Sequence, residues 1–163
     1  MKYVLTIIVL LSCVISGSSQ VNSRSNQNAL SFELGKTGLI YNLVFDHRLK
    51  QNKLGFRLGA GSNLAQYLNA VTVGGGGYYL AGKKKRFLEL GLDLQYYIVD
   101  KVSDDQKGFS FVYPDYSIKT IFFSLNAGYR SYGKKTMFRV GLSPGLIDNK
   151  FIPGGYISYG FTF

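Results

Sequence analysis

The stretch Phe87–Val99, FLELGLDLQYYIV, decides the fold. Apolar and polar side chains alternate along it, as they do in a strand whose successive side chains point to opposite faces. One face would carry Leu88, Leu90, Leu92, Leu94, Tyr96 and Ile98, and the other Glu89, Gly91, Asp93, Gln95 and Tyr97. Because a helical period would mix the carboxylates with the leucines, the stretch is predicted to be a β-strand.

The length of this strand indicates a membrane. Ordinary strands have about 5–6 residues, whereas about 9–11 residues at a tilt cross the hydrocarbon core of a bilayer. A membrane strand would turn its leucine face to lipid and its Glu89 and Asp93 face to a polar interior. The polarity would then be the reverse of that in a soluble barrel.

The rest of the chain repeats the pattern. It has 163 residues, one domain's length, with 20 Gly, 13 Tyr and 12 Phe but only 3 Pro and no Trp. Further strands are predicted at residues 29–35, 39–49, 54–61, 70–81, 118–132, 137–147 and 154–163. An even count of about eight favours an all-β fold, an antiparallel up-and-down transmembrane β-barrel.

Connections of two lengths alternate along the chain. Short Lys-rich turns follow the second, fourth and sixth predicted strands, and longer connections follow the third, fifth and seventh. In outer-membrane barrels short turns face the periplasm and longer loops face outward, so both termini are predicted to be periplasmic. The longest connection, residues 100–117, is rich in Phe and Tyr and is the candidate for contact with an extracellular partner.

The first 19 residues have the order of a secretory signal peptide. Lys2 is followed by an apolar run over residues 3–15, too short for a membrane helix, and then by small residues. Cleavage after Ser18 or Ser19 would leave residues 20–28 as a flexible mature N-terminus and residues 29–163 as the barrel domain. A lipoprotein signal at Cys13, the only cysteine, is an alternative that Leu11 fits poorly.

Charged residues gather on the predicted inward face: Glu33, Asp46, Arg48, Arg57, Glu89, Asp93, Arg130 and Arg139. A barrel of eight strands is just wide enough for side chains to fill it. Acids and arginines that pair inside would plug the interior as a static salt-bridge core. Pairs that break would instead gate a narrow ion path, and this alternative stays open.

The net charge of +10 comes from 19 Lys and Arg against 9 Asp and Glu, and much of the excess falls in turns. Nucleic-acid binding would need basic residues interleaved with stacking aromatics on one exposed surface, so a solvated rim is expected instead. Aromatic residues near that rim predict an interfacial girdle: Phe45, Phe56, Tyr79, Phe87, Tyr129, Phe138, Phe161 and Phe163.

Nothing in the sequence favours catalysis. His47 is the only histidine, has the parity of the lipid-facing set, and has no serine beside it in sequence. Glu89 and Asp93 would lie roughly 13 Å apart at strand rise, too far for an acid–base pair. With no metal-ligand cluster, phosphate loop or nucleotide fingerprint, we predict neither an enzyme nor a cofactor.

The leader, the hairpin YYLAGKKKRFLELGLDLQY and the end GYISYGFTF together resemble the small outer-membrane β-barrel proteins of the Bacteroidota, in the OmpA/OmpX-like, porin-like group of single-domain barrels. The resemblance covers nearly the whole mature chain. It implies that Tyr159, Phe161 and Phe163 form the signal read by the outer-membrane assembly machinery, although Ser158 stands where that signal often has glycine.

The function expected from these observations is that of an integral outer-membrane barrel with a structural or surface-interaction role. It would be monomeric, with membrane lipid and the assembly machinery as partners and no nucleic acid. A narrow gated channel is one alternative. A soluble secreted lipocalin-like carrier is another, and it requires the leucine face to point inward, which alternation alone does not decide.

Overall fold

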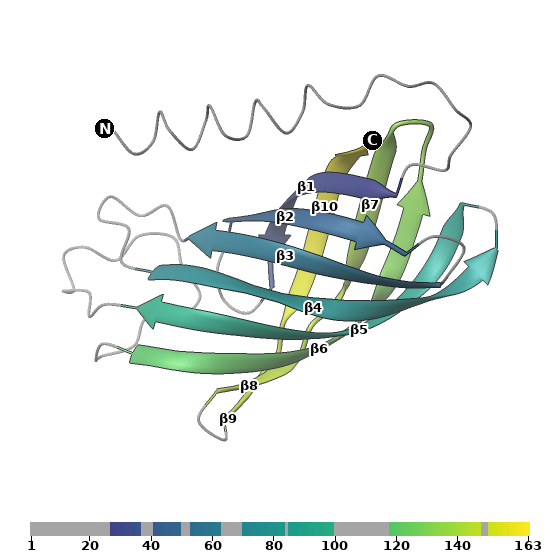
Figure 1. Cartoon of the computed structure of the whole chain (residues 1–163). Coiled ribbons are helices and arrows are strands. Elements are labelled where there is room, and N and C mark those ends of the chain that lie inside the picture. Colours follow the sequence, from purple (N-terminus) through teal and green to yellow (C-terminus); the bar gives the residue numbers. More distant parts are fainter. Residues whose placement is uncertain are drawn as a thin grey trace, which may run out of the picture.

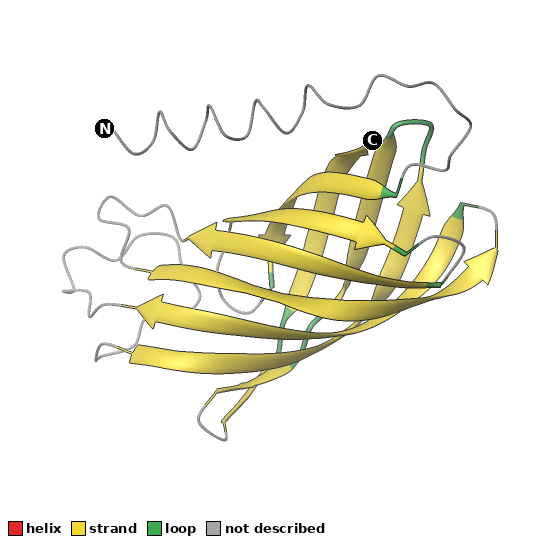
Figure 2. Ribbon diagram, viewed as in Figure 1, coloured by secondary structure: helices red, strands yellow, loops and turns green. Residues whose placement is uncertain are grey.

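The computed structural model describes residues 27–36, 41–49, 53–62, 70–83, 85–99, 118–147 and 150–163. Within them lie ten strands (Figures 1 and 2): β1 (Asn28–Gly35), β2 (Tyr41–Arg48), β3 (Leu54–Ser62), β4 (Ala70–Lys83), β5 (Arg86–Val99), β6 (Ile118–Tyr132), β7 (Thr136–Leu142), β8 (Gly145–Ile147), β9 (Lys150–Ile152) and β10 (Gly155–Thr162). No helix in this part of the chain is long and apolar enough to cross a membrane.

Eight of the strands, β1 to β7 and β10, form a closed antiparallel barrel, which confirms the predicted fold class. Consecutive strands pair from β1 to β7, and β10 closes the ring between β7 and β1. We call the end where β1 begins and β10 ends the terminal end. The β2–β3, β4–β5 and β6–β7 connections also lie there, and the other end is the loop end.

The last strand, β10, pairs with the first strand, β1. The Asn28 N–H donates to the Phe163 carbonyl at 3.2 Å, and the Phe163 N–H donates back at 2.9 Å. Asn28 therefore belongs to β1 and pairs with His47, so its assignment to a flexible terminus is wrong. The predicted leader, its cleavage site and the long connection 100–117 lie outside the described residues.

The predicted strand 137–147 is divided in the structure. Pro144 has no N–H to donate to a ladder, and the regular pairing of β7 with β6 ends at Leu142. The chain then continues as β8, which pairs with β6, while the Pro144 carbonyl accepts from the Leu125 N–H at 3.0 Å. The short strand β9 folds back on β8, so the prediction of a plain connection over 148–153 is wrong at residues 150–152.

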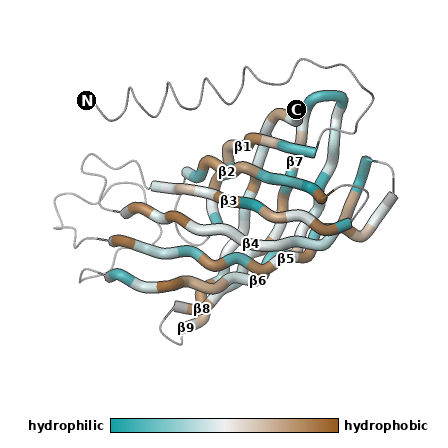
Figure 3. The backbone as a smooth tube through the Cα atoms, viewed as in Figure 1, coloured by the Kyte–Doolittle hydropathy of each residue, from teal (hydrophilic) through white to brown (hydrophobic). Residues whose placement is uncertain are grey.

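The barrel wall is polar inside and apolar outside. Along β5, Leu88 and Leu94 are 53% and 57% exposed, whereas Glu89 and Asp93 are 0% and 2% exposed. In Figure 3 brown and teal stretches follow one another along several strands, while the glycine-rich middle of β4 is white. Since a lipocalin-like carrier needs its leucines inside, the structure contradicts that alternative.

Candidate functional site: the charge network inside the barrel

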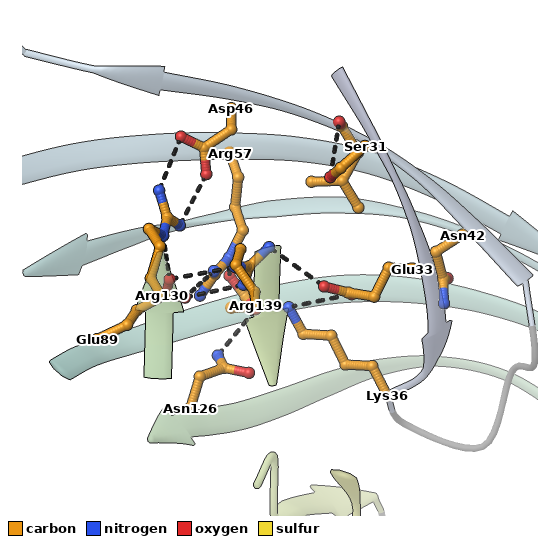
Figure 4. Close-up of polar contacts among 12 residues, drawn as sticks. Ser31, Glu33, Lys36, Asn42, Asp46, Arg57, Glu89, Asn126, Arg130 and Arg139 are labelled. Atoms are coloured by element: carbon orange, nitrogen blue, oxygen red, sulfur yellow. Dashed lines mark hydrogen bonds and ion pairs between the residues drawn. The ribbon is translucent and has the colours of Figure 1, made fainter. Parts of the chain in front are cut away.

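Glu89 lies at the centre of a buried network of ions (Figure 4). Its carboxylate accepts hydrogen bonds from three arginines, one on each of β3, β6 and β7. Arg130 Nε donates at 2.5 Å, Arg139 Nη2 at 2.8 Å, and the Arg57 guanidinium donates to Oε1. All four residues are at most 2% exposed, so this one acid holds three guanidinium groups away from water.

Arg130 extends the network towards the terminal end. It donates to both carboxylate oxygens of Asp46, at 3.1 and 2.9 Å, the two-point geometry in which an arginine binds a carboxylate most firmly. The Tyr78 hydroxyl donates to the same carboxylate at 2.6 Å, and the Tyr78 ring lies 4.1 Å from the Arg130 guanidinium carbon. Tyr78 therefore fixes both members of the pair.

Arg57 extends the network in the other direction. Its Nε donates to Asp93 at 2.8 Å, and the Asn126 amide donates to the other oxygen of Asp93 at 2.8 Å. The Lys36 ammonium completes the set by forming an ion pair with Asp93. Asp93 is therefore bound from three separate elements of the barrel.

Glu33 joins the network through Arg139 Nη1 at 3.2 Å and lies 3.8 Å from the Lys36 ammonium. The connected ions are four acids, Glu33, Asp46, Glu89 and Asp93, and four bases, Lys36, Arg57, Arg130 and Arg139. Their formal charges cancel. Cancellation matters because an ion buried without a partner costs several kcal/mol.

Two arginines stand directly opposite each other in the barrel wall. Arg130 on β6 and Arg139 on β7 are paired across the ladder, where like charges destabilise a sheet. Glu89 accepts hydrogen bonds from both arginines. Asp46 also binds Arg130, and Glu33 also binds Arg139. The repulsion is thereby replaced by bridges through carboxylates.

Lys36 reaches the network through an unusual backbone. It follows β1, and its φ of 62° lies in the left-handed region that side chains other than glycine seldom adopt. In this conformation its side chain is 3% exposed and its ammonium lies between Glu33 and Asp93.

Inward-facing glycines make room for these large side chains. A Cβ on Gly91 would lie 2.7 Å from Arg57 Nη2, and one on Gly55 would collide with the Tyr78 hydroxyl. On β4, a Cβ on Gly76 would collide with the Asp93 carboxylate. Of the four glycines at residues 74–77, Gly76 therefore faces the network, whereas Gly77 faces outward.

A cavity of about 10 Å³ lies on the loop side of Arg57, lined among others by Asn42 and Gly74. That volume holds about one water molecule. Arg57 is one of the residues that line this cavity, and its Nη2 has no hydrogen-bond partner among the described residues.

The structure brings together seven of the eight interior residues predicted from the sequence. The exception is Arg48, which is half-buried at the terminal end and has no carboxylate partner among the described residues. Its guanidinium carbon lies 5.1 Å from the Tyr132 ring instead. Among the described residues no ion pair joins Arg48 to the charge network, because β2 has left the level of the carboxylates by that residue, and its membership of the network stays a prediction.

Sequence reasoning missed Lys36, Tyr78 and Asn126. Period-two alternation already placed Asn126 on the polar face, and only its partner was unknown. Lys36 lies between the predicted strands 29–35 and 39–49, and no periodic pattern shows that a residue between two strands folds back into the barrel. Phe87 was placed in the outer girdle but has inward parity and packs edge-on against Tyr132, with ring centroids 5.9 Å apart.

The remaining candidates show no catalytic grouping. His47 Nδ1 lies 2.7 Å from Asn28 Oδ1, and its ring packs 5.1 Å from that of Phe56. Among the described residues, no group of three or more His, Cys, Asp or Glu is placed to hold a metal ion. Tyr159 and Phe161 are 55% and 65% exposed on the outer face of β10, and Phe163 follows it at 46%.

No protein-family model matches the sequence, and no curated protein matches it. The chain is similar to solved structures of Ail, an outer membrane protein of Yersinia pestis. The backbone structure in a phospholipid bilayer nanodisc has a TM-score of 0.48 at 10% identity, covering 85% of this chain and 100% of that one.

The crystal structure of Ail, the attachment invasion locus protein, in complex with the heparin analogue sucrose octasulfate has a TM-score of 0.47 at 11% identity, over 83% of this chain and 95% of that one. At these scores the assignment of the fold rests on the strand pairing itself. Membership of the OmpA/OmpX-like group and an origin in the Bacteroidota stay predictions.

Proposed function

We propose that this chain is an integral protein of the bacterial outer membrane, exported by its leader, whose barrel interior is closed by the charge network. The observation that carries the proposal is the reversed polarity of the wall. Leucines on β5 are about half exposed while the acids between them are buried. An exposed apolar belt around a barrel requires a lipid environment, and the outer membrane is where barrels of this class reside.

The proposed role is structural or in surface interaction. We propose that the protein acts as a monomer and that it is not an enzyme. The interior supports it, since four acids and four bases pair across the cross-section and leave a cavity of about 10 Å³ beside them. Contact with a partner would fall to the loop end.

Fractionation followed by gel mobility tests the membrane assignment. The processed protein is expected in the outer-membrane fraction, and after detergent extraction it should migrate differently with and without heating. Recovery as a soluble protein without detergent would contradict the proposal, because the apolar belt would then have to be covered by something other than lipid.

A narrow gated ion path is the second candidate, and the location of the network favours it, because the paired ions lie inside the barrel, where such a path would run. In planar bilayers the closed barrel should conduct no more than the background, and Glu89→Ala or Arg57→Ala should raise conductance. If the wild type conducts steadily, the closed interior is wrong and the channel becomes the main function.

A further inference from the structure

An apolar groove of about 880 Å³ crosses the outer surface of the barrel over β3, β4, β5 and β6. Its walls are formed by Leu54, Tyr79, Leu90 and Leu125, whose side chains point outward. The volume falls within the roughly 300–1,000 Å³ of ordinary ligand sites. On the proposed function, this surface faces the hydrocarbon of the bilayer.

The floor of the groove is made by two small residues. Gly77 faces outward, and a Cβ placed on it would meet only the Gly55 carbonyl oxygen, at 3.8 Å. Ala127 on β6 is exposed and lies opposite Leu90. Large side chains surround both positions, so the depression exists because these two residues leave the space empty.

One end of the groove meets a positive charge. Leu49 and Leu54, which flank the β2–β3 connection, line that end, and Lys53 lies beside them. The Lys53 ammonium lies 5.9 Å from the ring centroid of Tyr79, one of the walls, and its side chain is exposed. From there the groove runs across β4 and β5 to Leu125 in the middle of β6.

The two ends differ as the two ends of a phospholipid differ. An acyl chain would fill the apolar length, and a headgroup phosphate would lie at Lys53, where the wall meets water at the terminal end. Three strand spacings of about 4.8 Å separate β3 from β6, so the groove is roughly 14 Å long, enough for the greater part of one acyl chain. A lysine near a membrane surface attracts anionic lipid by about 1 kcal/mol.

We propose that this groove binds one phospholipid with an anionic headgroup, its acyl chain over Gly77 and its phosphate at Lys53. The inference rests on the proposed membrane location. It goes further by naming a lipid and a place for it on one side of the barrel.

Native mass spectrometry of the detergent-extracted protein tests the binding, with phosphatidylglycerol and phosphatidylcholine of identical chains as probes. Wild type should retain one phosphatidylglycerol in preference. Gly77→Leu fills the floor of the groove from β4, and Ala127→Leu fills it from β6. Each variant should displace about two methylene groups of the lipid's acyl chain and so weaken retention of phosphatidylglycerol about tenfold. Lys53→Gln should leave chain binding in place and lower the preference for the anionic lipid about fivefold.

Ala60→Leu is the matched control, since Ala60 is an exposed small residue on β3 that does not line the groove. Its retention should equal that of wild type. Equal retention by Gly77→Leu and Ala60→Leu would overturn the proposal. So would a wild-type dimer that Gly77→Leu converts to a monomer, because the occupant would then be a second copy.

Every variant is first tested for the heat-dependent shift in gel mobility. A shift without selective lipid retention refutes the groove and leaves the membrane barrel standing. A wild type that is soluble without detergent refutes the membrane barrel itself, so the two failures are distinguishable.

Discussion

The single carboxylate of Glu89 accepts hydrogen bonds from three buried arginines and balances part of their positive charge. Replacement by glutamine keeps the size of the side chain but removes its charge. The three guanidinium groups and the Lys36 ammonium would then share three acids, Asp46, Asp93 and Glu33, and one positive charge would be left over.

We expect Glu89→Gln to lower the free energy of unfolding by about 3–5 kcal/mol, the usual effect of breaking a buried pair from one side. Urea titration of the protein refolded in detergent, followed by heat-dependent mobility, measures this. Arg48→Gln is the control, because Arg48 has a ring contact but no carboxylate partner among the described residues. Equal losses in the two variants would show that the network contributes nothing special.

Lys36 combines two features that two substitutions separate. Lys36→Asn removes the cation but tolerates the left-handed backbone at φ 62°, whereas Lys36→Val removes the cation and strains the backbone. The free energy of unfolding of Lys36→Val should therefore be lower than that of Lys36→Asn by about 1–2 kcal/mol in the same urea titration. Variants of equal stability would contradict the strained conformation at this position.

The residues of the network were only partly predictable. Parity along a strand assigns a side chain to a face, and for Glu33, Asp46 and Arg57 this was sufficient. Parity does not give the level of a residue along the barrel axis, and so it does not show whether Arg48 reaches the carboxylates. Nor does it describe a turn residue such as Lys36, whose direction depends on one backbone angle.

At the scale of the element, β4 and β5 show that glycines in one hairpin have different roles. Gly91 faces inward against Arg57, and Gly77 faces outward into the groove. The two positions lie on neighbouring strands, so they differ chiefly in which side of the wall they face.

Alanine at these two positions tests that difference. Gly91→Ala places a Cβ 2.7 Å from Arg57 Nη2, and this overpacking should destabilise the barrel by about 1–3 kcal/mol. Gly77→Ala meets nothing nearer than 3.8 Å and should be neutral or slightly stabilising. Urea titration of both proteins side by side gives the comparison, and a reversed order would mean that the two strand faces are assigned wrongly.

The limits of the strands followed from alternation to within a few residues, and the division of one strand at Pro144 did not. A proline near a strand end is compatible with a bulge, an end or a break. Which one occurs depends on the neighbour, here the Leu125 N–H that bonds to the Pro144 carbonyl. Sequence periodicity contains no information about that partner.

For the whole molecule, strand number and antiparallel order followed from the even count and from connection lengths. The choice of face did not, because alternation is the same whether leucines point in or out. Burial of Glu89 and exposure of Leu88 decide it.

The assembly signal proposed for Tyr159, Phe161 and Phe163 predicts a defect in cells without a defect in stability. Phe161 and Phe163 point away from the barrel and are 65% and 46% exposed, so their removal takes little packing from the fold. Phe161→Ala with Phe163→Ala should refold in detergent like wild type, yet reach the outer membrane in much lower amount. Immunoblots of membrane fractions measure this.

Phe151→Ala is the matched control, since Phe151 is 68% exposed but lies on β9 rather than at the chain end. It should reach the membrane normally. An equal deficit in both proteins would mean that exposed aromatic area, and not the terminal signal, governs assembly.

The ion pairs join residues far apart along the chain: Arg130 and Asp46 are separated by 84 positions, and Arg139 and Glu33 by 106. Contacts of such separation form late in folding, when the ends of the chain have met. Until β10 closes the ring, several charged side chains without partners would line one face of a sheet whose other face contacts lipid. A partly formed barrel is therefore unstable in the bilayer, and insertion is coupled to closure of the barrel. Truncated chains should then be proteolysed before insertion instead of persisting as leaky fragments.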